Sequence, residues 1–211
     1  MSLTVLQESA SRRGNCVLIA IKARDRCKTR LAEALPPAAR KDLVRAMLES
    51  VLHAAQNAAT VQSVVVISPE RDTLPADIPV LADTGESLNS ALLHAHRLVR
   101  EFGCHEVVVL PADLPAITPS DIDELVRAGR TVGCAIAPDA AGAGTNALYL
   151  ATPAPFQFQF GPDSRQLHLR EAQRLGLTPR VVRRPGLELD IDSPADLERM
   201  EGQPWLTRLR A

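Results

Sequence analysis

The feature that most constrains the fold is an alternation of short apolar segments with helical patterns from residue 16 onward. The segments 16–21, 61–68 and 106–110 are largely apolar at successive positions, which is typical of strands buried on both faces of a parallel sheet. The segments between them repeat apolar residues at helical spacing. This order predicts a doubly wound α/β domain with a mostly parallel central sheet flanked by helices.

The length of 211 residues suits one α/β core and is short for two. We therefore expect a single domain over residues 16–211, preceded by a mobile N-terminal extension over residues 1–15. This extension lacks the continuous apolar core of a signal peptide, and no segment approaches the length of a membrane span. The four cysteines are widely spaced, which favours reduced thiols, and together these features predict a cytoplasmic protein.

Apolar stripes and capping residues predict the helices. The segment 87–102 gathers its apolar residues on one helical face, namely Leu88, Ala91, Leu92, Ala95, Val99 and Phe102. Two segments begin with the same capping pattern, which consists of Thr118, Pro119 and Asp121 in one and of Ser193, Pro194 and Asp196 in the other. A further helix is expected over about 164–175, and shorter strands over 134–138, 146–150 and 179–183.

A basic loop follows the first predicted strand. Overall charge is nearly balanced, with 24 basic and 25 acidic residues, which argues against nucleic acid or an anionic membrane as a partner. The loop itself is densely positive, with Lys22, Arg24, Arg26, Lys28 and Arg30. Ammonium and guanidinium groups suit the oxygens of a polyphosphate, and the carboxyl edge of such a sheet is where ligands bind. A solvated basic loop is the alternative.

Three aspartates are candidate metal ligands. Asp113 directly follows the strand 106–110, within a Leu-Pro-Ala-Asp-Leu-Pro segment. Asp190 and Asp192 are two residues apart, so in an extended segment both side chains point to the same side. Such carboxylates repel each other unless a cation lies between them, and oxygen ligands suit magnesium. The alternative for Asp113 is that it only caps a turn.

Small and polar residues mark two candidate ligand loops. Thr145 and Asn146 follow a glycine-rich stretch in which the backbone can approach a ligand closely. Gly161 and Ser164 lie at the N-terminus of a predicted helix, whose free N–H groups would favour an anion, although a plain turn and N-cap would leave the same pattern. His168, one turn into this helix, could touch a phosphate, but a place at the surface is expected. The aromatic residues are expected to pack in the core.

In this order, the motifs identify the family that the chain resembles. They are Lys22, "KTRL" at 28–31, "ESLNSAL" at 86–92, "LPADLP" at 110–115, "GTNAL" at 144–148, "FGPDS" at 160–164 and "LDIDSPADL" at 189–197. The set resembles the 2-phospho-L-lactate guanylyltransferase family of coenzyme F420 biosynthesis, which includes phosphoenolpyruvate and 3-phospho-D-glycerate guanylyltransferases. This resemblance implies a Rossmann-like fold similar to that of the nucleotide-diphospho-sugar transferases (GT-A-like).

The resemblance also implies GTP as co-substrate, Mg²⁺ as cofactor and a role for each matched residue. Metal ligands would be Asp113, Asp190 and Asp192. Contacts to the nucleotide would come from Lys22, Lys28, Arg30, Leu88 and Asn89. Catalysis would involve Lys22, Lys28, Arg30 and Asp113. Contacts to the phosphorylated acid would come from Thr145, Gly161 and Ser164.

The expected reaction transfers GMP from GTP to the phosphate of a small phosphorylated carboxylic acid and releases pyrophosphate. The motifs leave open whether this acid is 2-phospholactate, phosphoenolpyruvate or 3-phosphoglycerate. They also leave open a homodimer and the hand-over of product to a downstream transferase. Two alternatives are a GT-A-type glycosyltransferase, which would release a nucleoside diphosphate, and a nucleotide-binding module without enzymatic activity.

Overall fold

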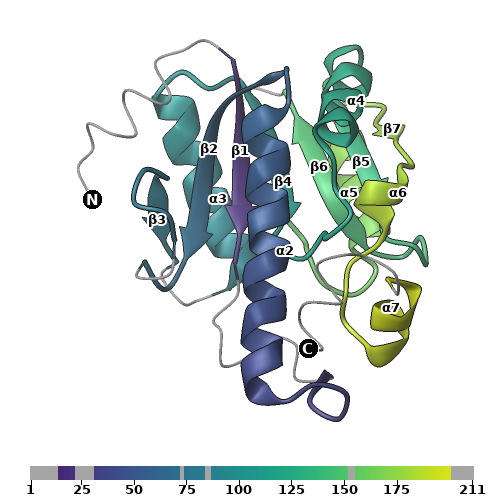
Figure 1. Ribbon diagram of the computed structural model, residues 1–211. Coiled ribbons are helices and arrows are strands. Elements are labelled where there is room, and N and C mark those ends of the chain that lie inside the picture. The colour runs from purple at the N-terminus through teal and green to yellow at the C-terminus, as the bar shows by residue number, and fades with distance from the viewer. Residues whose placement is uncertain (1–13, 22–30, 72–73, 84–86, 152–154, 201–211) are drawn as a thin grey trace.

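A seven-stranded sheet forms the centre of the protein, with helices on both of its faces (Figure 1). The computed structural model describes residues 14–21, 31–71, 74–83, 87–151 and 155–200. Its strands are β1 (Asn15–Ala20), β2 (Val61–Ser68), β3 (Val80–Ala82), β4 (Glu106–Pro111), β5 (Cys134–Pro138), β6 (Thr145–Leu150) and β7 (Arg180–Val181). Its helices are α2 (Pro37–Asn57), α3 (Leu88–Glu101), α4 (Pro119–Arg130), α5 (Ser164–Arg174), α6 (Pro185–Glu188) and α7 (Pro194–Arg199).

The strands lie in the order β3-β2-β1-β4-β6-β5-β7, and one of them runs against the others. The pairs β1–β2, β1–β4, β2–β3 and β5–β7 are parallel. Strand β6 is antiparallel to both of its neighbours, β4 and β5. The predicted mostly parallel sheet flanked by helices is therefore confirmed, and the reversal of β6 places its first residues at the carboxyl edge of β4.

The continuous apolar runs arise because each central strand packs against helices on both faces. In β4, Val108 and Leu110 belong to the core shared with α2 and α4, whereas Val107 and Val109 belong to the core shared with α3 and α5. The predicted stripe of α3 is confirmed, since Ala91, Leu92, Ala95 and Val99 are all buried. The aromatic side chains pack as expected: Tyr149, Phe156 and Phe158 are buried, and Phe160 is partly buried against the same core.

Both predicted capping patterns are present as capping boxes. Thr118 caps α4, with Pro119 in the first turn and Asp121 bonding back to the cap, and Ser193 caps α7 in the same way. The strand predicted at 179–183 is shorter in the structure, and β3 and α6 were not predicted. These last two elements have three and four residues, which is too short for a periodic signal.

Strand β1 begins at Asn15, one residue before the predicted strand, so the last residue of the expected N-terminal extension lies in the sheet. The rest of the expected extension lies outside the described residues, except Gly14. None of the helices in the described part of the chain has the length and apolar character needed to cross a bilayer.

Candidate active site

A cavity of about 720 Å³ opens at the carboxyl edge of the sheet. Its walls include Ala20 and Ile21 at the end of β1, the segment 111–113 at the end of β4, and the first residues of β6. Because β6 runs antiparallel to β4, Thr145 and Asn146 face the same space as Asp113. The sheet thus brings together two candidate groups that the sequence separates.

The three candidate metal ligands line this cavity. Asp113 arrives from the end of β4, and Asp190 and Asp192 arrive from the segment between α6 and α7. Burial raises the pKa of the Asp190 carboxyl, and the negative charges of Asp113 and Asp192 raise that pKa further. The carboxylates are therefore close enough to repel one another, as expected for groups that share a cation.

Asn146 holds Asp190 in place. Its side-chain amide donates to the carbonyl oxygen of Glu188 at 3.2 Å and to Oδ1 of Asp190 at 3.4 Å. Asn146 is itself buried at the start of β6. The strand that carries Thr145 is thereby fastened to the segment that carries the acidic pair.

The donor set fits magnesium only if the ligand supplies part of the coordination. Within the described ranges, no three acidic, histidine or cysteine side chains converge to form a complete metal site. Mg²⁺ is commonly held by one or two carboxylates together with substrate phosphate oxygens and waters. The repulsion at Asp190 and the all-oxygen character of the group fit that arrangement, and the three-aspartate assignment stays a prediction.

A further group of candidate residues lies in the loop before α5 and at the start of that helix. Gly161 and Ser164 line the cavity, and Ser164 is the first residue of α5. Gly161 has a φ of 136° and Asp163 has a φ of 56°, so the chain turns sharply just before the helix. The first two N–H groups of α5 are used within the protein, because Ser164 donates to the carbonyl oxygen of Gly161 at 3.2 Å and Arg165 donates to that of Ala143 at 3.1 Å.

Asn89 ties this loop to α3. Its side-chain amide donates to the carbonyl oxygen of Phe160 at 3.1 Å and accepts from the Phe160 N–H at 2.8 Å. Leu88 and Asn89 both line the cavity, next to the N-cap residue Ser87. Their contacts to the nucleotide remain a prediction. Asn89 additionally connects α3 to the loop before α5.

The prediction that His168 lies at the surface is wrong. The ring is fully buried, one helical turn after Ser164. Its Nε2 accepts from the backbone N–H of Gln159 at 3.0 Å, and its Nδ1 lies 3.0 Å from Oγ1 of Thr145. The spacing of four residues from Ser164 was the available signal, because it places both side chains on one face of α5.

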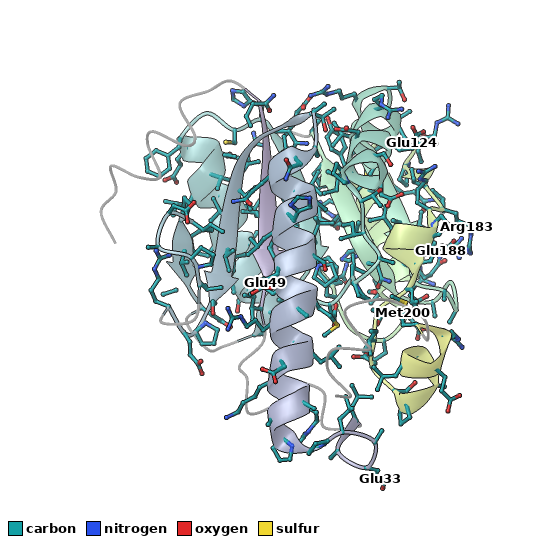
Figure 2. The ribbon with its side chains drawn as sticks, viewed as in Figure 1. Glu33, Glu49, Glu124, Arg183, Glu188 and Met200 are labelled. Atoms are coloured by element: carbon teal, nitrogen blue, oxygen red, sulfur yellow. The ribbon has the colours of Figure 1, made fainter. Side chains whose placement is uncertain are left out.

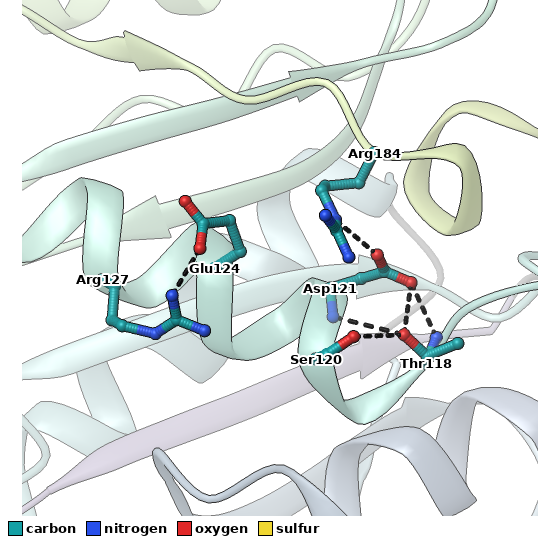
Figure 3. Close-up of polar contacts among 6 residues, drawn as sticks. All are labelled: Thr118, Ser120, Asp121, Glu124, Arg127 and Arg184. Atoms are coloured by element: carbon teal, nitrogen blue, oxygen red, sulfur yellow. Dashed lines mark hydrogen bonds and ion pairs between the residues drawn. The ribbon is translucent and has the colours of Figure 1, made fainter.

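The segment that carries the acidic pair is fastened to α4 (Figure 3). Arg184 donates through Nε to Oδ1 of Asp121 at 2.8 Å, and Oδ2 of Asp121 accepts from the backbone and side chain of Thr118. A Cβ on Gly186 would overlap the Asp121 carboxylate and lie 2.8 Å from the carbonyl oxygen of Ala116, so only glycine allows this approach. Arg183 and Glu188 add an ion pair across α6 (Figure 2).

Lys22, Lys28 and Arg30 lie outside the described residues. Of their described neighbours, Ile21 lines the cavity and Leu31 is buried. The predicted role of the basic loop in binding triphosphate stays a prediction.

Two buried histidines predict an acid-sensitive fold. Burial lowers the pKa of both His96 and His168 from 6.5 to about 4. Between these two pH values the unfolded chain binds more protons than the native one, so the free energy of unfolding should fall as the pH drops from about 6.5 to 4. Calorimetric melting temperatures over this range should show the decline.

His94 and His96 supply matched variants for this prediction, because His94 is exposed on the same helix. His96→Gln should remove part of the pH dependence, whereas His94→Gln should leave it unchanged. If the melting temperature falls equally steeply with decreasing pH in both variants, groups other than His96 cause the acid sensitivity.

Three comparisons place the chain among known proteins. A family model described as "Guanylyl transferase CofC like" matches residues 15–202. A phosphoenolpyruvate guanylyltransferase from Rubrobacter xylanophilus is 38% identical over 189 residues, which cover 87% of this chain and 92% of that protein. A second phosphoenolpyruvate guanylyltransferase, from Chloroflexus aurantiacus, is 38% identical over 192 residues, which cover 88% of this chain and 92% of that protein.

Among solved structures, a protein from Desulfovibrio desulfuricans G20 described as a nucleotide-diphospho-sugar transferase is similar. The TM-score is 0.78 at 17% identity, over 93% of each chain. The fold class is thereby confirmed, and the sequence matches confirm the family resemblance drawn from the motifs.

Proposed function

Because the chain belongs to the CofC-like guanylyl transferase family, we propose that it transfers GMP from GTP to the phosphate group of phosphoenolpyruvate and releases pyrophosphate. The relatives at 38% identity are named for this acceptor. Membership of the family makes the chain a nucleotidyltransferase, which argues against the non-enzymatic alternative. Its place in coenzyme F420 biosynthesis, a homodimer and hand-over of product stay predictions.

The observation that carries the proposal is the shared cavity. The cavity is lined by Asp113, Asp190 and Asp192 and also by Thr145, Gly161 and Ser164. The carboxylates suit the metal complex of a triphosphate, and the hydroxyls of Thr145 and Ser164 suit a phosphorylated acid. Guanylyl transfer needs these two kinds of ligand side by side, because one must attack the other.

The reaction proposed for this cavity is an in-line displacement. A phosphate oxygen of the acceptor forms a bond to the α-phosphorus of GTP. The bond from that phosphorus to the oxygen bridging to the β-phosphorus breaks, and its electron pair leaves with pyrophosphate. The attacking phosphate is already anionic at neutral pH, so the protein needs only to hold both substrates in line and to neutralise charge.

The residues have distinct tasks in this scheme. Asp113 and Asp190, with Asp192, would hold magnesium, which when bound neutralises charge on the triphosphate. Thr145, Gly161 and Ser164 would orient the acid, and Asn89 would keep the Phe160–Gly161 loop against α3. His168 uses both ring nitrogens in hydrogen bonds, so it does not act as a general base.

A pyrophosphate-release assay that crosses two nucleotides with three acids tests the proposal. GTP or ATP is combined with phosphoenolpyruvate, 2-phospholactate or 3-phosphoglycerate, with and without Mg²⁺. The expected result is release only with GTP, an acid and Mg²⁺ together, and fastest with phosphoenolpyruvate. Faster release with another acid would contradict the acceptor assignment, and GDP release onto a sugar acceptor would support the glycosyltransferase alternative.

A further inference from the structure

The hydrogen-bond geometry around His168 fixes which nitrogen carries the proton. The Gln159 backbone N–H can only donate, so Nε2 of His168 must be the unprotonated, accepting nitrogen. A neutral imidazole then carries its hydrogen on Nδ1, which lies 3.0 Å from Oγ1 of Thr145. Nδ1 therefore donates, and the Thr145 oxygen accepts.

The surroundings keep this ring neutral and in place. The ring is fully buried, its edge meets Phe160 at a centroid distance of 4.7 Å, and Phe156 packs at 5.8 Å. Burial lowers its pKa to about 4, with the nearby Glu171 carboxylate opposing that shift. The Glu171 carboxylate already pairs with Arg174 and accepts from the Gln157 N–H. It therefore does not require a protonated His168 ring as a partner.

We propose that His168 is a positioning residue that makes the hydroxyl of Thr145 a hydrogen-bond donor to the anionic acceptor in the cavity. With one lone pair occupied by the Nδ1 hydrogen, the hydroxyl has its own hydrogen free to point at a ligand. The opposite tautomer would make Thr145 donate to the ring and present only lone pairs to the ligand. This inference rests on the proposed function, because it assigns Thr145 to the phosphorylated acid.

The consequence is a subsite selective for groups that only accept hydrogen bonds. Carboxylate and phosphate oxygens have this property. Thr145 is buried and lines the cavity, so a ligand in the cavity is the partner available to the hydroxyl hydrogen. His168 thus acts through Thr145 without touching the substrate.

The test begins with the unliganded wild-type protein. Nitrogen-15 NMR of the histidine rings should show His168 protonated on Nδ1 and unprotonated on Nε2 at pH 7. The Nε2-protonated tautomer, or a doubly protonated ring, would overturn the proposal. This measurement does not depend on the reaction, so its outcome is separate from the fate of the proposed function.

The kinetic test is a double-mutant cycle between His168 and Thr145. His168→Phe keeps a ring but removes both hydrogen bonds, and Thr145→Val keeps the shape but removes the hydroxyl. Each should raise the KM for phosphoenolpyruvate about tenfold or more, as expected for a lost hydrogen bond to a charged group. The KM for GTP should stay within about twofold, and the double variant should be no worse than Thr145→Val.

Conservative variants separate positioning from packing. His168→Asn retains an amide donor near the position of Nδ1 and should reverse part of the KM increase of His168→Phe. Thr145→Ser retains the hydroxyl and should reverse most of the KM increase of Thr145→Val. Additive effects in the double variant would mean that His168 acts through packing alone and would overturn the proposal. If His168→Phe does not fold, two other measurements decide the proposal. They are the tautomer of His168 in the wild-type protein and the KM for phosphoenolpyruvate of Thr145→Val and Thr145→Ser.

Discussion

Replacing Asp113 by asparagine is expected to slow guanylyl transfer by about a hundredfold or more while the protein stays folded. The amide keeps the shape of the carboxylate but removes the negative charge that a hard divalent cation requires. Asp113 is half-buried at the end of β4, and the apolar contacts of the adjacent Leu114 are unaffected. Steady-state turnover with GTP, phosphoenolpyruvate and Mg²⁺ measures the loss of activity. A thermal melt without metal measures whether the variant stays folded.

The cavity contains a matched control for Asp113. Asp139 also lines it, but its Oδ1 accepts from the backbone N–H of Ala143, a bond that an asparagine oxygen can preserve. Asp139→Asn should therefore leave turnover within a few-fold of wild type. If Asp113→Asn instead unfolds readily and retains its specific activity, Asp113 is a structural cap.

Asp190→Asn should show the same loss of turnover with a different effect on stability. Burial and two neighbouring carboxylates oppose the ionised form of Asp190 at neutral pH. An asparagine removes that repulsion and can keep the hydrogen bond with Asn146, so the metal-free variant should melt at a higher temperature than wild type. A lower melting temperature would show that the Asp190 carboxylate is stabilising in the absence of metal.

Asp121→Asn is expected to lower the free energy of unfolding by about 2–4 kcal/mol. The buried carboxylate accepts from the N–H and hydroxyl of Thr118 and from Nε of Arg184, which is 63 residues away in the chain. An amide group has only one oxygen, so one set of donors would face an NH₂ group. Denaturant unfolding gives the value, and the melting temperature should fall by about 2–4 °C per kcal/mol at this chain length.

Asp196 is the control for Asp121, because it occupies the same position in the capping box of α7. Its carboxylate accepts from the N–H and hydroxyl of Ser193, and its arginine partner, Arg199, lies only three residues away on an exposed face. Asp196→Asn should cost about 1 kcal/mol, the usual loss for a capping interaction. Equal losses at the two positions would mean that the Arg184 contact does not fasten α6 to α4.

The elements that the sequence predicts well have local signals. Val107 to Leu110 form a strand whose alternate residues enter two cores, so a continuous apolar run was the correct indicator. Thr118 and Ser193 cap their helices together with aspartates three positions later, and this short spacing is visible in the sequence. The candidate site followed from the same logic, because strand ends of a parallel sheet meet at one edge.

The features that were missed depend on long-range contacts. The four-residue spacing from Ser164 places His168 on one face of α5, but its hydrogen-bond partners, Gln159 and Thr145, leave no pattern in the sequence. The reversal of β6 is equally hidden, since its apolar run suits a buried strand of either direction. That reversal brings Thr145 to the same edge of the sheet as Asp113, so only the strand order shows that both residues line one cavity.

The central claim is that a phosphate oxygen of the acid attacks the α-phosphorus of GTP in this cavity. Phosphorus-31 NMR of a reaction with phosphoenolpyruvate labelled with oxygen-18 on its non-bridging phosphate oxygens tests it directly. We expect the isotope shift on both phosphorus atoms of the new diphosphate, because the labelled oxygen becomes the bridge, and no label in pyrophosphate. Label in pyrophosphate, or GDP in place of the mixed diphosphate, would contradict the account.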